Sequence, residues 1–170
     1  DRLNYCSAPM NNVGYCKAVE NMLGVDIPPK AKAIRIILCE LSRVIDHLVC
    51  IGANAVDLGA LTGFFHLFTY REKVYTLFEK LCGARLTVSL TRVGGMANDP
   101  PEDWYKDVLQ FCKEMKKGID ELDTLLTGNK IWMQRTQHVG AISAEEAIGK
   151  AGRYLRESGH RLIPDSDPTP

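Results

Sequence analysis

The sequence lacks the short motifs that mark several large classes of enzyme. Gly94 and Gly95 are adjacent, but neither GxGxxG nor GxxxxGK[ST] occurs, which argues against a nucleotide site. A GxSxG elbow and an HExxH pair are also missing, which argues against an ordinary hydrolase or zinc peptidase. The cysteines form no CxxC or CxxH spacing, so we expect no metal site made within this chain.

Net charge and long apolar runs are absent as well. The 21 basic and 21 acidic residues balance, which leaves no electrostatic footprint for nucleic acid or anionic lipid. No run of about 18 apolar residues could span a bilayer, and no signal peptide opens the chain. The first residue is Asp and the last segment is rich in proline, so we expect a piece of a longer polypeptide.

The chain does contain enough apolar material for one core. Its 170 residues are 45% hydrophobic, which favours a single folded domain. The six cysteines are far apart and fall within helical patterns, so we expect most of them to be buried thiols in a reducing compartment. They are Cys6, Cys16, Cys39, Cys50, Cys82 and Cys112.

One long helix is predicted over 28–62, opened by the pair Pro28 and Pro29. A stripe of apolar and small side chains steps along it by three and four residues, and its small members would let another helix come close. The stripe comprises Ile34, Leu38, Leu41, Ile45, Leu48, Gly52 and Ala55.

A polar seam lies on the opposite face of the same helix. It comprises Arg43, His47, Cys50, Asn54 and Asp57, and apolar residues fill both flanks. A helix that is apolar nearly all round is expected to be buried, and a buried charge must find a partner or shift its protonation. The seam is therefore where we expect function.

The remaining pattern predicts a mainly α-helical bundle around this long buried helix, with minor extended segments. A non-helical segment of ten residues precedes a helix that ends at Gly24. Glycines are also expected to end helices at Gly83 and Gly128. The expected helices are 11–23, 28–62, one within 63–83, 102–126, 129–137 and a piece capped by Ser143 and Glu146, with extended chain over 84–93. The helical domain is predicted to cover 1–152 and an irregular segment 153–170.

Three groups of residues could carry chemistry. Tyr5 is either a packed tyrosine bonded to a backbone carbonyl or a proton donor to a ligand carbonyl, and nothing local decides between the two. His47 fits a satisfied core histidine, and it lies roughly 15 Å from Asp57 along the helix, too far for direct contact. Asp57 opposes the helix dipole and would need a partner. Arg85 and Arg92 flank the extended segment.

Six blocks in fixed order resemble one family over about residues 1–150. They are DRLNY, IPPKAKAIRIILCELSRVIDHLVCIGANAVDLGALTGFF, YREK, GARL, RVGG and VGAISAEEAI. Together they resemble the D-type subunit of NADH:quinone oxidoreductase, respiratory complex I, which is related to the large subunit of nickel-iron hydrogenases. The resemblance therefore implies a fold like that of the hydrogenase large subunit.

The resemblance also implies a site. Tyr5 corresponds to a tyrosine that hydrogen-bonds a quinone carbonyl, Arg2 to an arginine near the partner's terminal iron-sulfur cluster, and Asp57 to an aspartate that pairs with a quinone-binding histidine upstream of this chain. The substrate would be ubiquinone or menaquinone. NAD and the iron-sulfur clusters would be bound by other subunits, and this chain would bind no metal.

Partners and place follow from the same resemblance. The expected partners are the terminal iron-sulfur subunit, other peripheral-arm subunits and, through the complex, the membrane arm. The expected place is the cytoplasmic face of a bacterial inner membrane, with the matrix face of the mitochondrial inner membrane as the alternative. Thr87 replaces a usual histidine, and Gly63 replaces a usual proline, which is expected to loosen the turn into Phe64 and Phe65.

Two other functions are compatible with the sequence. The large subunit of a membrane-bound, energy-converting nickel-iron hydrogenase shares an ELxRxxxHL-like helix, and its CxxC pairs would lie outside this chain. Alternatively, the chain is a non-catalytic assembly element that only binds the cluster subunit. The DRLNY and VDLGALT blocks favour the oxidoreductase, which would be active only as part of a complex.

Overall fold

The computed structural model describes residues 3–141, 143–144 and 148, and these residues are mainly helical, as predicted. The elements are α1 (Ala8–Leu23), α2 (Pro29–Asp57), α3 (Leu61–Cys82), β1 (Thr91–Arg92), β2 (Gly95–Met96), α4 (Trp104–Thr127) and α5 (Lys130–Thr136). Contacts divide the chain into two units, Asp1–Met133 and Gln134–Pro170. The predicted boundary at 152 and Glu146 of the expected capping box lie outside the described residues.

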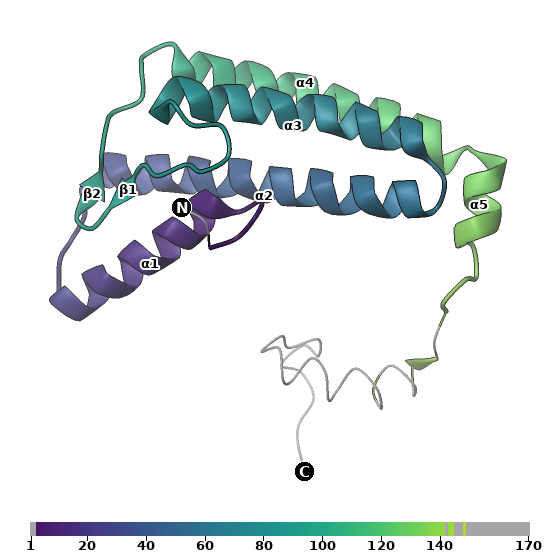
Figure 1. Cartoon of the computed structure of the whole chain (residues 1–170), viewed down its shortest axis with the longest axis horizontal. Coiled ribbons are helices and arrows are strands. Elements are labelled where there is room, and N and C mark those ends of the chain that lie inside the picture. Colours follow the sequence, from purple (N-terminus) through teal and green to yellow (C-terminus); the bar gives the residue numbers. More distant parts are fainter. Residues whose placement is uncertain (1–2, 142, 145–147, 149–170) are drawn as a thin grey trace. The chain divides into compact units, whose positions relative to one another are not determined.

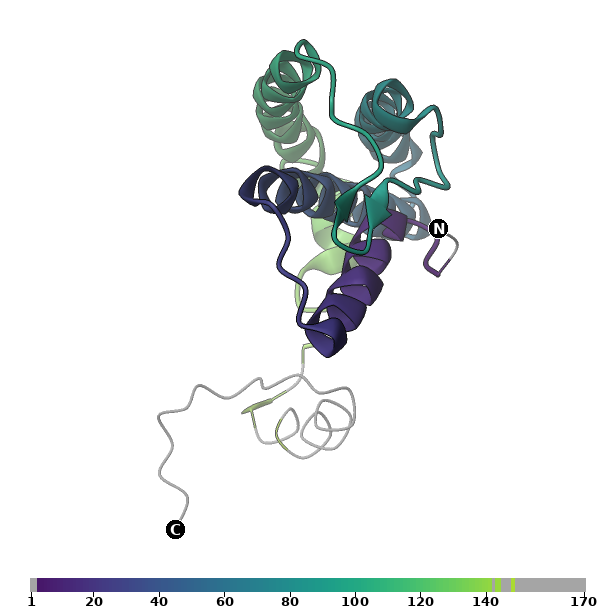
Figure 2. The ribbon, with the colours of Figure 1, turned by 90° about the vertical axis from the view of Figure 1, so that its left-hand side faces the viewer.

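Helix α2 is the longest element of the first unit, and α1 and α3 both pack against it (Figure 1). Viewed along the helices, α2, α3 and α4 surround a common centre (Figure 2). The predicted stripe is confirmed, because all seven of its residues are buried. Four of them meet Val74 and Phe78 of α3 and Trp104 of α4 in one core, namely Ile34, Leu38, Leu41 and Ile45. Leu48 packs in a second cluster with Leu67 of α3 and Leu122 of α4.

The close approach predicted for the small residues of α2 is found. A Cβ atom added to Gly52 would lie 3.3 Å from Cδ2 of Phe64 and 3.5 Å from Cε2 of Phe68 in α3. Helix α2 nevertheless ends at Asp57, not at residue 62. Gly59 adopts a φ of 86°, and this left-handed residue lets the chain reverse so that α3 begins at Leu61.

The expectation that α2 is buried nearly all round is wrong for the described structure. All five residues of its polar seam are exposed. His47, one of them, is therefore not a core histidine. The reason is that α1, α3 and the hairpin β1–β2 contact α2 mainly over its apolar stripe. The opposite face has no covering element among the described residues.

Helix α4 packs on α3 through a face that differs in part from the prediction. The apolar period of this helix predicts a buried stripe of Trp104, Val108, Cys112, Met115, Ile119, Leu122 and Leu126. Trp104, Val108 and Leu122 are buried as expected, but Phe111 and Gly118 replace Cys112 and Ile119 on the buried face. The Trp104 indole is fully buried and donates to the carbonyl of Leu77 at 2.9 Å. The buried face of α4 is thus centred on Trp104 and Leu122, and Cys112 and Ile119 lie beyond its edge.

Two further expectations are corrected, the burial of the cysteines and the first residue of α1. Cys6 and Cys16 are buried, Cys39 and Cys82 are partly buried, and Cys50 and Cys112 are exposed, so the expectation of mostly buried thiols is met only in part. Helix α1 begins at Ala8, three residues earlier than predicted, because Pro9 fits the first helical turn. Gly24 and Gly83 are left-handed stops, as predicted.

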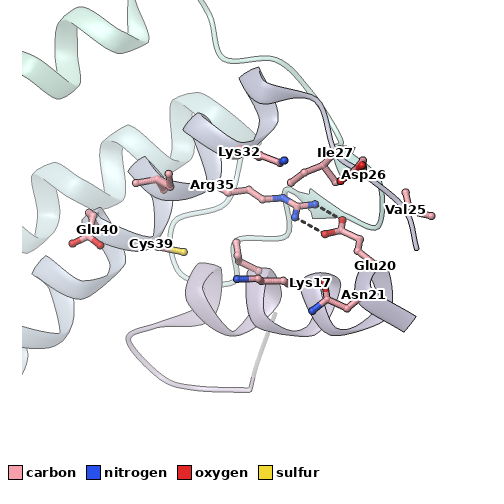
Figure 3. A pocket seen from close by; sticks show the side chains of 12 residues that line it. Lys17, Glu20, Asn21, Val25, Asp26, Ile27, Lys32, Arg35, Cys39 and Glu40 are labelled. Carbon is pink, nitrogen blue, oxygen red and sulfur yellow. Dashed lines mark hydrogen bonds and ion pairs between the residues drawn. The ribbon is translucent and has the colours of Figure 1, made fainter. Parts of the chain in front are cut away.

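A buried ion pair joins α1, α2 and the hairpin. Arg35 donates to both carboxylate oxygens of Glu20 at 2.9 and 2.7 Å (Figure 3). It also donates to the carbonyls of Arg92 and Gly95 at 2.9 and 3.0 Å. The amide of Gly94 donates to Glu20 at 2.8 Å. Hydrogen bonds from Arg35 hold the pKa of Glu20 at about 2, below its ordinary value of 4.5, although burial acts in the opposite direction.

We expect this pair to make stability depend on pH. Because the folded pKa of Glu20 is lowered, its stabilisation is present above about pH 4.5 and is lost as the pH falls toward 2. Glu20→Gln should therefore lower the midpoint of urea unfolding at neutral pH, and its difference from the wild type should shrink over that acid range. Glu102→Gln, in an exposed loop, is the control. A constant difference at every pH would contradict the assignment.

The contact between α3 and α4 should depend on Gly118. The ring of Tyr70 occupies the place where a Cβ atom at position 118 would lie, and His66 Nε2 contacts the Gly118 carbonyl at 3.0 Å. Gly118→Ala should lower the free energy of unfolding by about 1–3 kcal/mol, because the Tyr70 ring must move. Gly14→Ala, in open space on α1, should instead raise it by about 0.5–1 kcal/mol. Urea unfolding of both variants checks the contrast.

Candidate functional site

Hydrogen bonds fix the segment that precedes α1 to the middle of α2. The Ser7 hydroxyl donates to Asp46, and Asn4 donates to the Ser7 hydroxyl at 3.0 Å. Ser42, one turn before Asp46 on α2, donates to the carbonyl of Cys6 at 3.4 Å. Figure 1 shows the N-terminal segment beside α2. We call residues 3–7 the lead-in segment.

Tyr5 lies within the lead-in segment with its side chain outward. The side chain is 64% exposed, and its hydroxyl makes no hydrogen bond within the described residues. The interpretation as a packed tyrosine bonded to a backbone carbonyl is therefore wrong for this structure. The phenol remains available to a ligand that approaches from outside.

Buried polar groups surround the attachment of the lead-in segment. Burial raises the pKa of the Cys6 thiol; Asp46 raises it further, and Arg71 opposes both. Burial likewise raises the pKa of the Tyr75 phenol, against Arg71. The Arg71 guanidinium stacks 4.1 Å from the centre of the Phe68 ring, while its Nε and the Tyr75 hydroxyl are buried without a hydrogen bond in the described structure.

Asp57 is the last residue of α2 and is exposed. Its carboxylate takes part in no hydrogen bond or ion pair among the described residues. Asp57 follows Asp46 by eleven residues, which is just over three whole turns of an α-helix. Asp46 and Asp57 therefore share one face of α2, about 16 Å apart along its axis.

The structure attaches the lead-in segment to α2 at Asp46 and places Asp57 on the same face of that helix, but Tyr5 and Asp57 make no contact with each other. Between the two ends of this face lie Cys50 and Ala53, whose small side chains are exposed. The face therefore offers the Asp57 carboxylate at its end and little steric bulk between Asp57 and the point where the lead-in segment is attached. The roles given to Tyr5 and Asp57 stay predictions.

The other residues named from the sequence take different places. Arg2 lies outside the described residues. Arg85 pairs with Glu72 and with Glu79 at 2.5 and 3.1 Å, and Arg92 donates to backbone carbonyls of its own loop. Thr87 lies in the segment before β1 and is half-buried.

Gly63 does not loosen a turn. It is the third residue of α3, where a Cβ atom would lie 3.4 Å from Cδ2 of Leu126 in α4. Its amide donates to the carbonyl of Ala60 at 3.1 Å. The glycine therefore serves close packing between α3 and α4 at this position.

A cavity of about 510 Å³ opens between α1 and α2, away from these residues (Figure 3). Charged side chains from both helices and the loop between them line it, together with Cys39 and several aliphatic residues. The charged residues are Lys17, Glu20, Asp26, Lys32, Arg35 and Glu40. None of the residues predicted for the site lines this cavity.

Sequence reasoning missed the residues that organise the lead-in segment and the hairpin. Glu20, Arg35 and Asp46 each pair across elements that are distant in sequence, so periodicity alone could not find their partners. One signal was available for Arg35. It falls beside Ile34 on the buried side of a long helix, where a charge requires a partner.

Two broader searches cover only the described part of the chain. No cluster of three or more His, Cys, Asp or Glu side chains there is arranged to hold a metal ion. No helix in the same part combines the length and apolar character needed to cross a membrane.

Known proteins resemble this chain over nearly its whole length. Residues 57–162 match the family model described as respiratory-chain NADH dehydrogenase, 49 Kd subunit. The chain is 63% identical over 164 residues to the C/D-type subunit of NADH-quinone oxidoreductase from Bdellovibrio bacteriovorus, covering 95% of this chain and 29% of the relative. It is 47% identical over 161 residues to the D-type subunit from Methylacidiphilum infernorum, covering 94% and 38%.

A further relative is a D-type subunit of NADH-quinone oxidoreductase, numbered 2, from Thermodesulfovibrio yellowstonii. It is 45% identical over 161 residues, with 94% of this chain and 40% of the relative covered. The chain therefore spans between 29% and 40% of the length of these three relatives. The family model matches more than half of the chain. The chain accordingly belongs to the family of the 49 kDa subunit of respiratory-chain NADH dehydrogenase.

Proposed function

We propose that this chain is part of the subunit that forms the quinone-reduction site of a proton-translocating NADH:quinone oxidoreductase. The observation that carries the proposal is the alignment of 94–95% of the chain with relatives named as D-type or C/D-type subunits of NADH-quinone oxidoreductase. The shared face of α2, with Tyr5 attached near Asp46 and with Asp57 at its end, is consistent with it. The complex, and not this chain alone, would be the enzyme.

In this proposal Tyr5 and Asp57 act at opposite carbonyls of one quinone. The exposed phenol of Tyr5 donates a hydrogen bond to one carbonyl and can pass on its proton as negative charge develops there. Asp57 orients a histidine from outside this chain toward the other carbonyl. Two electrons and two protons convert the quinone to quinol, and the electrons come from the iron-sulfur cluster of the partner.

The exposed seam of α2 supports a partner at this face. The face carries exposed polar side chains, namely Arg43, His47 and Asn54. The apolar side chains of Ile51 and Val56 beside them are also exposed, as expected for a surface that another protein covers. We propose that the terminal iron-sulfur subunit covers this face and that Arg2 lies near its cluster. Ubiquinone or menaquinone is the substrate, and NAD is bound by another subunit.

The same reasoning extends to the architecture and the place in the cell. We propose a fold like that of the hydrogenase large subunit, with residues 1–152 forming part of the helical quinone-site domain. The complex would place this chain at the cytoplasmic face of the bacterial inner membrane. Other peripheral-arm subunits, and the membrane arm through the complex, are the remaining partners.

The energy-converting hydrogenase is the weaker alternative, because the compared relatives are all named as subunits of NADH-quinone oxidoreductase. A non-catalytic assembly role predicts a different outcome in mutants. Variants of the site would then change how much complex assembles without changing the turnover of the complex that forms.

The first test replaces the phenol in the assembled complex. Tyr5→Phe should lower quinone reductase activity at least about tenfold while assembly survives, because the proton donor is lost and the ring is retained. Tyr15→Phe is the matched control, since its side chain is 65% exposed against 64% for Tyr5. Unchanged turnover of a short-chain quinone by Tyr5→Phe would argue against the catalytic role.

The second test removes the charge at the end of α2. Asp57→Asn should lower quinone reductase activity about tenfold, because an amide pairs less strongly with a histidine that must carry positive charge. Asp57→Glu should restore part of the loss. Asp120→Asn, on the exposed face of α4, serves as the control. Equal activity of Asp57→Asn and the control would remove Asp57 from the site.

A further inference from the structure

We propose that Asp46 is a positioning residue for Tyr5, acting through Ser7 and the backbone of the lead-in segment. This inference rests on the proposed function, because it concerns the same quinone site. It assigns a task to a carboxylate that lies between the buried stripe and the polar seam of α2. Asp46 itself need not touch the quinone.

The first support is the hydrogen-bond chain on both sides of Tyr5. The Ser7 hydroxyl donates to the Asp46 carboxylate and accepts from the Asn4 side chain at 3.0 Å. Asn4 immediately precedes Tyr5, and Ser7 follows it by two residues. The bond from Asn4 to Ser7 therefore closes a loop of four residues around the tyrosine, and the Asp46 carboxylate ties this loop to α2.

The second support is the orientation of the segment relative to α1 and α2. The Ser7 carbonyl accepts from the Asn11 amide at 3.1 Å and from the Asn11 side chain at 3.0 Å, which joins the segment to the start of α1. Ser42 holds the Cys6 carbonyl one turn away from Asp46 on α2. Ser7 itself is 3% exposed, so its hydroxyl depends on these protein partners.

The third support is the freedom of the Tyr5 side chain. Its hydroxyl has no hydrogen bond among the described residues, and most of the ring is exposed. The direction of the phenol is thus set by the backbone that carries it. Loss of the Asp46 contact would free the Ser7 side chain, and with it the Asn4 contact, so the phenol would no longer be held in one position. Misplacement of a reacting group by about 1 Å can lower the rate of catalysis by a large factor.

The experiment uses the assembled complex and a double-mutant cycle. Asp46→Ala should lower kcat/KM for the quinone about tenfold, the loss expected for a hydrogen bond to a charged group. Asp46→Asn should stay within about twofold of the wild type, because its side-chain oxygen can still accept from Ser7. Asp99→Ala is the control, since Asp99 forms only an exposed pair with Lys30.

The decisive measurement is made in the Tyr5→Phe background. If Asp46 acts through the phenol, Asp46→Ala should add less than about twofold to the loss already caused by Tyr5→Phe. A full additional tenfold loss would overturn the inference and leave the proposed function intact. If Tyr5→Phe alone has no effect, the proposed function fails first, so the two failures are distinguishable.

A smaller change keeps the test decisive if Asp46→Ala does not assemble. Ser7→Ala removes the same contact, and the Ser7 side chain makes no capping hydrogen bond to α1, so the helix start should survive. Ser7→Ala should reproduce the loss in kcat/KM and the non-additivity with Tyr5→Phe. Wild-type kinetics in Ser7→Ala would overturn the proposed route from Asp46 to Tyr5.

Discussion

The burial of one apolar stripe on α2 is the constraint on which the rest of the described structure depends. Seven residues at helical spacing commit one side of a long helix to the interior, and α1, α3 and the hairpin gather on that side. The opposite side, with its polar seam, is left open. The surface where the site is proposed therefore follows from the same pattern that forms the core.

The sequence predicted this core well because its signal is local and periodic. The stripe on α2, the face of α3 through Val74 and Phe78, and the stops at Gly24 and Gly83 are all found. Gly59 was missed because the residues around it continue an apolar pattern, which hides a left-handed break. Cys112 and Ile119 were placed inside because they lie at the edge of the apolar stripe of α4, roughly 80° and 60° round the helix from Trp104 at about 100° per residue, where α3 does not cover them.

The site was less accessible to sequence reasoning. From residues alone, Tyr5 stayed undecided between two interpretations, and only the family resemblance gave Tyr5 and Asp57 a shared task. The attachment at Asp46 spans 39 residues of sequence, and the bonds from Arg35 to the hairpin span 57 and 60. Such pairs have no period to reveal them, since their partners are defined by tertiary folding.

The order of the helices also bears on how the chain acquires its structure. Helix α2 packs on α3, and α3 on α4, so the largest contacts join successive helices, with only the short hairpin β1–β2 between α3 and α4. Contacts between consecutive elements require little loop-closure entropy and favour rapid folding. The pairs of successive helices can thus form early during synthesis. The lead-in segment can be fixed only after the middle of α2 has left the ribosome, because Ser7 needs the Asp46 carboxylate as its acceptor.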